Sequence, residues 1–305
     1  MIPADIKLKT RQFSAVETAL HSLFGVNAGI SGRKFLTRGK GTAAYKLTLE
    51  SGKEVFLKTA PPERASIFLE EAAGLEAIAE TETVSTPRLF CTGCGDEYSF
   101  LMTEFMEGKT QAADYWEVFA HRLAAMHQTD TKGLVPGGRY GFSHDNHIGA
   151  TAQINTPYAS WIDFFRECRL KPQFQLAMNY FKKEEQEQIP KLLNRLGDIL
   201  TEPEFPSLLH GDLWCGNVIT GNDGQAWMID PAAYVGHAEA DIAMTELFGG
   251  FPRKFYDAYR KVMPMQPGYS KRRGLYNLYH LLNHLNLFGS SYLAEVKYLM
   301  GEYIR

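Results

Sequence analysis

One loop and the short run that follows it most constrain what this chain can fold into. The loop is HGDLWCGN (210–217), and IDP (229–231) follows it after a strand-like stretch. A carboxylate on such a loop can take the proton of an acceptor hydroxyl, while amide and carboxylate oxygens hold Mg²⁺ on nucleotide phosphates. We therefore predict Asp212 as a catalytic base, with Asn217 and Asp230 as metal ligands. HGD alone, or Asp-Pro alone, would be a weak signal, but the ordered set is rare by chance.

Composition limits the class of protein. The 305 residues suffice for two packed domains or one two-lobed unit, and the formal net charge of −3 argues against a nucleic-acid binder. The start, MIPADIKLKTRQF, lacks the apolar region of a signal peptide, and no window approaches the uninterrupted apolar length of a membrane span. We expect a cytoplasmic protein with neither nucleic acid nor a membrane as partner, and its oligomeric state stays open.

The cysteines are too few to form a disulfide scaffold for a chain of this length. They are Cys91, Cys94, Cys168 and Cys215, which fits a reducing compartment. Cys91 and Cys94 form a CxxC pair, but a zinc site would need a second pair or histidines at ligand spacing. We predict that this pair is reduced and structural.

The order of predicted elements indicates an α+β protein of two lobes. Short runs rich in β-branched and aromatic residues predict strands at 34–39, 43–50, 54–60, 87–93 and 98–105, with a helix at 65–80. Helical patterns dominate later, near 112–128, 158–170, 184–200, 239–248 and 270–300, while 208–230 looks like a loop flanked by short strands. The predicted domains are an N-lobe with a small mixed β-sheet (1–102), a hinge (103–107) and a mostly helical C-lobe (108–305). A nucleotide would bind between the lobes.

The N-lobe supplies candidate residues for the nucleotide. Gly39 and Gly41 lie between two strands, where their backbone could approach phosphates or simply form a hairpin turn. Lys58 ends an apolar strand and needs a carboxylate partner, which we expect to be Glu71 on the next helix, although the adjacent Glu70 is an alternative. Four residues of the hinge region are predicted to meet the adenine through their backbone: Thr103, Glu104, Phe105 and Met106.

The motif residues resemble one kinase family. HGDLWCGN with IDPAAYVGHAEADIAMTELFGGF is similar to the fructosamine kinase (ketosamine-3-kinase) family, within the aminoglycoside-phosphotransferase and choline-kinase-like group. Further matching stretches are YGFSHDNHIGATAQINT (140–156), WIDFFRECRL (161–170) and LYNLYHLLNHLNLFG (275–289), so the resemblance runs from about residue 33 to the C-terminus. Members are ATP-dependent kinases that phosphorylate the sugar 3-hydroxyl of ketosamines, the adducts formed when sugars glycate amines.

The resemblance implies a bilobal protein-kinase-like fold, ATP and Mg²⁺ as cofactors, and a small-molecule or protein-bound ketosamine as substrate, hence a role in protein deglycation. It assigns the base to Asp212, the metal ligands to Asn217 and Asp230, and phosphate positioning to Lys58 with Glu71, in agreement with the residue-based prediction. HGD, Asn and Asp are common to the whole kinase-like group. The resemblance is narrowed to this family by three features: the tryptophan at position 214 of the motif, the GHAEAD stretch and the 140–156 block.

The chain departs from the family pattern at two places. Cys215 stands where a serine or another small residue is expected, so a thiol lies in the predicted catalytic loop. Some relatives have a cysteine in the Gly-rich loop that could serve redox control, whereas ISGRKFLTRGKGTAAYK (30–46) has none. Redox switching through that loop is therefore not supported.

The acceptor side is less specific in sequence. Its candidates are Trp214, Asp145, Asn146, His237 and Glu239. Trp214 could stack on a sugar or amine, or fill a core. Asp145 and Asn146 could bind the acceptor, brace the lobes or form a solvated turn. His237 and Glu239, with Asp241, could line the acceptor site or only cap and brace the following helix.

Two other functions remain as alternatives. An aminoglycoside- or choline-type kinase would favour a dense acidic or aromatic acceptor wall, and the C-terminal half has no concentrated acidic run. A catalytically dead kinase-like binding module would not need Lys58, Asp212, Asn217 and Asp230 together. Sequence does not specify the amine carrier or the sugar length.

Overall fold

The computed structural model describes residues 14–304, which form two compact units. The first unit contains the described residues up to 73 together with 87–107, and the second contains 74–86 and the described residues from 108 onward. Residues 74–86, which fall inside the predicted N-lobe of 1–102, thus make their contacts in the second unit. Residues 1–13 of that lobe lie outside the described residues. Within the described range, no helix has the length and apolar character needed to cross a membrane.

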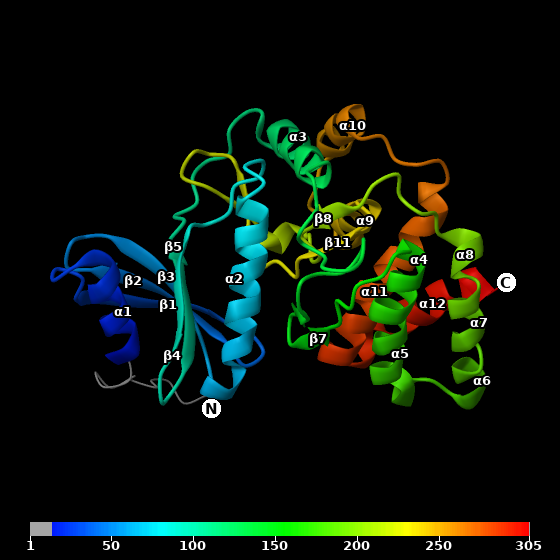
Figure 1. Ribbon diagram of the computed structural model, residues 1–305, viewed down its shortest axis with the longest axis horizontal. Helices are drawn as coiled ribbons and strands as arrows, with labels where there is room; N and C mark the ends of the chain where they lie inside the picture. The colour runs from blue at the N-terminus through cyan, green and yellow to red at the C-terminus, as the bar shows by residue number, and fades with distance from the viewer. Residues whose placement is uncertain (1–13, 305) are drawn as a thin grey trace. The chain divides into compact units, whose positions relative to one another are not determined.

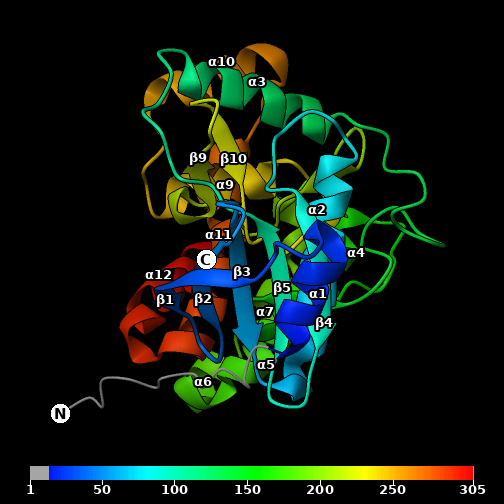
Figure 2. The ribbon, with the colours of Figure 1, turned by 90° about the vertical axis from the view of Figure 1, so that its left-hand side faces the viewer.

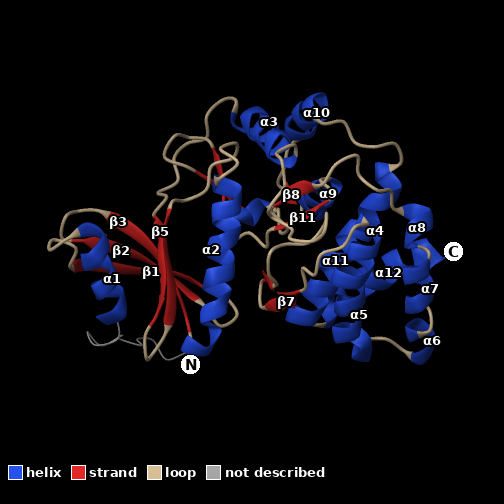
Figure 3. Ribbon diagram, in the orientation of Figure 1, coloured by secondary structure: helices blue, strands red, loops and turns tan. Residues whose placement is uncertain are grey.

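The first unit is a five-stranded sheet with two helices (Figures 1 and 3). Its elements are α1 (Ser14–Phe24), β1 (Ile30–Arg38), β2 (Ala43–Leu49), β3 (Glu54–Ala60), a 3-10 turn (Pro62–Arg64), the start of α2 (Ala65–Ala79), β4 (Leu89–Cys94) and β5 (Ser99–Glu104). The strand order is β1-β2-β3-β5-β4, and every pairing is antiparallel, so the sheet itself is not mixed. The predicted strands and the helix at 65–80 are confirmed, whereas α1 was not predicted.

Strand alternation explains how this sheet is covered on both faces. Successive residues of a strand point to opposite faces. Phe100 and Met102 of β5 accordingly join the apolar cluster under α1, which includes Leu20. Leu101, between them, packs with Phe68 of α2 on the other face. Two small cores of this kind hold β3, and with it Lys58, in a fixed position.

The second unit is mostly helical and surrounds one large apolar core (Figure 3). Its longer helices are α3 (Tyr115–His127), α9 (Glu239–Leu247), α10 (Arg253–Val262), α11 (Tyr269–Phe288) and α12 (Leu293–Ile304). Shorter helices are α4 (Trp161–Phe164), a π-helical segment (Phe165–Leu170), α5 (Lys171–Ala177), α6 (Lys183–Gln186), α7 (Ile189–Asn194) and α8 (Leu196–Ile199), with 3-10 turns at Met178–Tyr180, Cys215–Asn217 and Ser290–Tyr292.

Most predicted helices are present, with instructive differences. The segment predicted at 184–200 is divided among α6, α7 and α8, and Pro190 stands in the first turn of α7, where the missing N–H of proline is tolerated. Helix α10 was not predicted, although Phe255, Ala258 and Tyr259 are buried at helical spacing. Helix α10 packs beside α3, as Figures 1 and 2 both show.

Small strand pairs carry the loops of interest in the second unit. β8 (Ser207–Leu209) pairs with β11 (Tyr234–Gly236), and β9 (Val218–Thr220) pairs with β10 (Ala226–Met228), both antiparallel. A third pair joins β6 (Asn146–Ile148) to β7 (Thr151–Gln153). Residues 210–217 therefore leave β8 and enter β9, while residues 229–233 connect β10 to β11 alongside them.

Candidate active site

The HGD loop is fixed against the segment that follows Asp230. Gly211 has a φ of +82°, and a Cβ at this position would collide with the carbonyl oxygen of Ala232. Only glycine suits both conditions. The amide of Ala232 donates to the carbonyl oxygen of His210 at 2.9 Å. The two segments that carry Asp212 and Asp230 are thus held together by their backbones.

His210 supports the loop from within the core. Its side chain is fully buried, and Nε2 lies 2.9 Å from the carbonyl oxygen of Ile229. The amide of Asp212 donates to Nδ1 at 3.2 Å. Burial is the main influence on the pKa of His210 and lowers it, which favours the neutral ring that these two bonds require. His210 is therefore a positioning residue for the backbone of Asp212.

Asn217 is oriented by Asp212. Its Nδ2 lies 2.8 Å from the carbonyl oxygen of Asp212 and 3.2 Å from Oδ2 of the same residue. Because the amide nitrogen faces Asp212, Oδ1 must point the other way. That oxygen makes no hydrogen bond to other described residues, so it is available as a metal ligand.

The Asp212 carboxyl has a perturbed acidity. Burial raises its pKa to about 7; the hydrogen bond from Asn217 works against this, and the nearby charges of Asp230 and Asp241 add to it. A carboxylate with a pKa near the working pH is well suited to accept a proton from an alcohol. A cation bound beside it would lower this pKa again.

Asp230 combines exposure with a rare backbone conformation. Its side chain is exposed, and its φ is +54°, in the left-handed region that non-glycine residues seldom adopt. Such conformations concentrate at functional sites. Among the described residues no cluster of three or more His, Cys, Asp or Glu side chains could hold a metal. An amide oxygen and a carboxylate fit Mg²⁺, which takes its other ligands from water and phosphates.

Asp241 braces the HGD loop (210–217) and was only partly recognised from sequence. Its buried carboxylate accepts the amide protons of His210 at 2.8 Å and Gly211 at 3.0 Å. Nε2 of His127 lies 3.3 Å from Oδ2. Against the effect of burial, these donors and the nearby imidazole rings lower the pKa of Asp241. Bracing, one of the two predicted roles, is the one its contacts support.

His237 and Glu239 lie in a separate buried network. Both carboxylate oxygens of Glu239 bind Arg272, at 2.6 and 2.8 Å, and Glu239 is 2% exposed. Nε2 of His237 faces Oε1 of Gln266 at 3.3 Å. Neither side chain forms a hydrogen bond or ion pair with Asp212 or other described residues of the catalytic loop. These contacts favour bracing over the predicted acceptor contact.

Asn146 likewise braces the loop after Asp230. Its Nδ2 donates to the carbonyl oxygen of Ala233 at 2.8 Å, and its Oδ1 accepts from Gln153 and Asn155. Gln153 also donates to Ala232, at 3.0 Å. Asp145 belongs to the same hydrogen-bond network, because its Oδ1 accepts the amide proton of Asn155 at 2.7 Å. For Asn146, which is buried, the predicted alternative of a solvated turn does not fit these contacts, whereas Asp145 is exposed and all of its predicted alternatives stay open.

Trp214, one of the predicted acceptor residues, is exposed and lies two positions after Asp212. It is 37% exposed and makes an edge contact with Phe248, with ring centroids 6.3 Å apart. A Cβ on Gly216 would collide with the indole, so the ring lies over that glycine. Cys215 is exposed and faces Gly250. The indole of Trp214 is therefore partly exposed near Asp212 and is not buried in the core.

In the first unit, Lys58 and Glu71 form an ion pair. Nζ of Lys58 lies 2.8 Å from Oε1 and 2.9 Å from Oε2 of Glu71. Both side chains are largely buried, so each stabilises the charge of the other. Glu71, rather than Glu70, is thus the carboxylate that faces Lys58 in this position.

The Gly-rich turn joins β1 to β2. The amide of Gly39 donates to the carbonyl oxygen of Thr42 at 3.0 Å, and Gly41 has a φ of +84°. Arg64 binds the carbonyl oxygen of Lys40 at 2.8 Å and lies so close to Gly41 that a Cβ there would collide with its guanidinium. This glycine is required both by the turn and by the arginine. The contact of Arg64 with this turn was not predicted.

The predicted hinge begins inside a strand. Thr103 and Glu104 end β5, and the amide of Glu104 donates to the carbonyl oxygen of Arg88 at 2.9 Å. Phe105 and Met106 follow, and Nζ of Lys46 lies 4.6 Å from the Phe105 ring centroid. Whether these backbones meet adenine stays a prediction.

The cysteines of the CxxC pair both belong to β4 and are free thiols. Cys91 lies opposite Met102 of β5, and Cys94 lies opposite Ser99. Residues three apart on a strand point to opposite faces, which does not suit a disulfide. Cys168 is also free and buried.

Comparison with known proteins identifies relatives of the whole chain. The sequence profile described as fructosamine kinase matches residues 12–305. A probable ketoamine kinase of Synechocystis is 39% identical over 90% of this chain and 91% of its own length. The chloroplastic protein-ribulosamine 3-kinase of Arabidopsis thaliana is 37% identical over 88% of this chain and 86% of its own length.

Solved structures agree with this result. A crystal structure provisionally assigned as a fructosamine-3-kinase from Haemophilus somnus has a TM-score of 0.85 and 28% identity, covering 95% of this chain and 97% of the other. A second, from Thermobifida fusca, has a TM-score of 0.82 and 30% identity over 95% and 99%. A macrolide 2'-phosphotransferase, with a TM-score of 0.64 and 17% identity over 98% and 99%, shares the fold alone. The predicted family resemblance and the predicted α+β, protein-kinase-like fold are confirmed.

Proposed function

This chain belongs to the fructosamine kinase family, and we propose that it transfers the γ-phosphoryl group of ATP to a sugar hydroxyl of a ketosamine. The curated relatives carry the names ketoamine kinase and protein-ribulosamine 3-kinase, which supports this acceptor class. The acceptor would be a small molecule or a glycated protein side chain.

The orientation of Asn217 by Asp212 is the observation that carries the proposal. Asp212 holds the amide nitrogen of Asn217, which leaves the amide oxygen for a cation. Asp212 would accept the proton of the attacking hydroxyl, and its raised pKa suits that task. One loop of eight residues (210–217) thus provides both a proton acceptor and a ligand for the metal.

Mg²⁺ fits the oxygen donors present, and Asn217 and Asp230 would hold it. Bound there, the ion would neutralise charge on the nucleotide phosphates. In the first unit, Lys58, aimed by Glu71, would contact phosphate oxygens, while Gly39 and Gly41 would offer backbone N–H groups. Residues 103–106 would meet the adenine.

Trp214 is our candidate for contact with the acceptor. A partly exposed indole close to the proton acceptor can stack on the apolar face of a sugar or on the carbon chain of its amine. Replacing Trp214 with alanine should raise the KM for the acceptor more than it changes the KM for ATP. Equal effects on both would remove this role.

The test is an ADP-release assay with purified protein and a panel of acceptors. Ribulosamines and fructosamines carried on lysine should be phosphorylated, and the matching free sugars should be poorer because the amine arm contributes remote binding energy. Choline should be poor, because its single hydroxyl leaves polar groups unpaired in a site that hydrogen-bonds several hydroxyls of a sugar, and aminoglycosides should be poor because their hydroxyls lie on rings of a different arrangement.

The Asp212→Asn variant, purified in the same way, is the control for contaminating kinases. Phosphorylation of kanamycin or choline without any ketosamine activity would replace the proposed acceptor while retaining the kinase reaction. ADP release that persists unchanged in the variant would show that the signal comes from another protein.

A further inference from the structure

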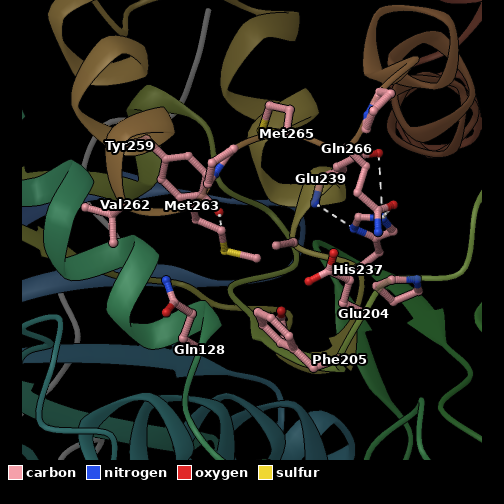
Figure 4. Close-up of a pocket in the computed structure, with 15 residues that line it drawn as sticks. Gln128, Glu204, Phe205, His237, Glu239, Tyr259, Val262, Met263, Met265 and Gln266 are labelled. Atoms are coloured by element: carbon pink, nitrogen blue, oxygen red, sulfur yellow. Dashed lines mark hydrogen bonds and ion pairs between the residues drawn. The ribbon is translucent and has the colours of Figure 1, made fainter.

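A well-formed pocket lies in the second unit, apart from the residues assigned above to catalysis and to metal binding. It encloses about 460 Å³, the size range of small-molecule sites. Its walls come from the loop before β8, from the start of α9 and from the end of α10 with the segment that follows. Figure 4 shows Met263, Phe205 and Glu204 around the same open space.

The lining favours a ligand with an apolar body. Val262, Met263, Met265 and Phe205 are apolar residues of the wall, and methionine thioethers adapt to ligands of irregular shape. All four side chains are partly or well exposed, and burying their apolar surface against a ligand would be favourable. A flat ring or a short branched chain would fill this space.

The charges of the lining residues determine which charge the polar end of that ligand should carry. Among the described residues that line the pocket there is no lysine or arginine. Glu204 is exposed and forms no ion pair with another described residue, whereas the charge of Glu239 is already matched by Arg272. A cationic group would therefore be attracted to the mouth of the pocket, and an anion would be repelled.

An unpartnered polar group in the wall is a second, independent observation. Ser207 lines the pocket and is 1% exposed, and its hydroxyl has no hydrogen-bond partner among the described residues. A buried hydroxyl without a partner costs free energy, which a ligand that donates to it or accepts from it would recover. Burial of this kind points to a site that is complete only when occupied.

Hydrogen bonds connect the pocket wall to the catalytic loop. Tyr259 lines the pocket, and its hydroxyl lies 2.7 Å from Nδ1 of His127. Nε2 of His127 lies 3.3 Å from Asp241, which accepts the amide protons of His210 and Gly211. The Tyr259 hydroxyl also lies 3.3 Å from Sδ of Met263, so a ligand that moves this thioether changes the surroundings of the first group in the series.

We propose that this pocket binds a small amphiphilic amine, an apolar ring or chain carrying a cationic nitrogen, and that Tyr259, His127 and Asp241 transmit its presence to the catalytic loop. The binding part does not depend on the proposed kinase function. Tyr259 and His127 are positioning residues, since they act on the loop through Asp241.

The binding test uses three indole probes whose short side chains end in a cationic, a neutral and an anionic group: tryptamine, tryptophol and indole-3-acetate. Full-length protein with ¹³C-methyl methionine is titrated by NMR, and the Met263 and Met265 signals are assigned from M263L and M265L. Tryptamine should shift both signals and bind tightest, with tryptophol weaker and indole-3-acetate weakest. No shift with any probe at millimolar concentration, or tightest binding of the anion, would overturn the site.

Two variants locate the binding. Glu204→Gln should weaken tryptamine about two- to fivefold, the effect of one exposed ion pair, and should leave tryptophol unchanged. Val262→Trp should block the pocket and abolish the shifts. Matched controls at exposed positions elsewhere are Glu187→Gln and Val26→Trp, which should behave as the parent protein does. Equal loss in the controls would contradict the location.

The connection to the loop has its own readout. With ¹⁵N-glycine labelling, tryptamine should shift the amide of Gly211, whose proton is donated to Asp241. Tyr259→Phe should keep the methionine shifts and lose the Gly211 shift. A Gly211 shift that persists in this variant would overturn the role of Tyr259. Because neither signal depends on phosphoryl transfer, the outcome is distinct from a failure of the proposed kinase activity.

Discussion

Replacing Asp212 with asparagine should raise the stability of the unliganded protein while it removes activity. The Asp212 carboxyl has a pKa of about 7, against 3.8 in the absence of its surroundings, and burial is the main cause. Holding this group ionised at pH 8 therefore costs folding free energy. The asparagine side chain carries no charge and can still accept the hydrogen bond from Asn217.

The size of the effect follows from the shift. At about 1.4 kcal/mol per pKa unit, a shift of about three units sets a ceiling of roughly 4 kcal/mol. The Asp212 side chain is partly exposed, so water stabilises its charge and a gain of about 1–2 kcal/mol is more realistic. For a unit of this size, that corresponds to a rise in Tm of roughly 3–6 °C.

The stability gain of Asp212→Asn should depend on pH. A carboxyl whose folded pKa is raised destabilises the folded state once the unfolded chain ionises, and the full cost is reached above the folded pKa. The advantage of Asp212→Asn should therefore be largest at pH 8, decrease as the pH is lowered, and vanish once the pH lies below the unfolded pKa of about 3.8. Thermal unfolding across this range measures it, with Asp198→Asn as an exposed control.

The same substitution should also lower the turnover rate. Loss of a general base should lower kcat by about 10²- to 10⁴-fold while ATP binding is largely retained. An Asp212→Asn protein that is less stable at pH 8, or whose advantage does not change with pH, would refute the reasoning about burial. Near-normal turnover would remove Asp212 from the mechanism.

Three further predictions concern the same unit. Asn217→Ala and Asp230→Ala should raise the Mg²⁺ concentration needed for activity, partly rescued by excess Mg²⁺ in the first variant; an unchanged Mg²⁺ profile in both would reject the metal assignment. Cys215 is exposed and should be alkylated by iodoacetamide, with Mg-ATP protecting it in mass spectrometry; labelling that ATP leaves unchanged would place the thiol away from the nucleotide. Asp241→Asn should lower the free energy of unfolding by roughly 2–4 kcal/mol at pH 7, because two buried bonds to a carboxylate are weakened. Since the pKa of Asp241 is lowered, that loss should shrink as the pH falls below 4, and a difference that is constant with pH would contradict it.

Local patterns in the sequence were sufficient to predict most of the elements and to propose the reacting residues. The β-branched and aromatic residues of 54–60 and 98–105 were sufficient to predict the strands, and the helix that follows β3 places Glu71 where Lys58 can reach it. The spacing of Asp212 and Asn217 within one loop was likewise a local property. Such features can be predicted from sequence because they depend on a few neighbouring residues.

The supporting contacts were not predictable in the same way. His127 lies 114 positions from Asp241, and Asn146 lies 87 positions from Ala233, so only the packed unit brings each pair together. Nothing in the sequence near Asp241 distinguishes a brace of the catalytic loop from a helix-capping carboxylate. Helix α10 is different, because its helical spacing was visible and was not used.

Three carboxylates of the second unit differ in how completely hydrogen bonds pair their oxygens. Both oxygens of Glu239 accept from Arg272, and both oxygens of Asp241 accept from backbone amides or face His127, so each of these four oxygens already has a hydrogen-bond partner. Asp212 accepts from Asn217 through one oxygen only, and burial raises its pKa instead of lowering it. A fully paired carboxylate is stable and inert, whereas a proton acceptor must keep an oxygen free and bear the cost of its charge. The weak pairing of Asp212 is therefore the property that distinguishes the base from its neighbours, and the stability gained by removing its charge measures that cost.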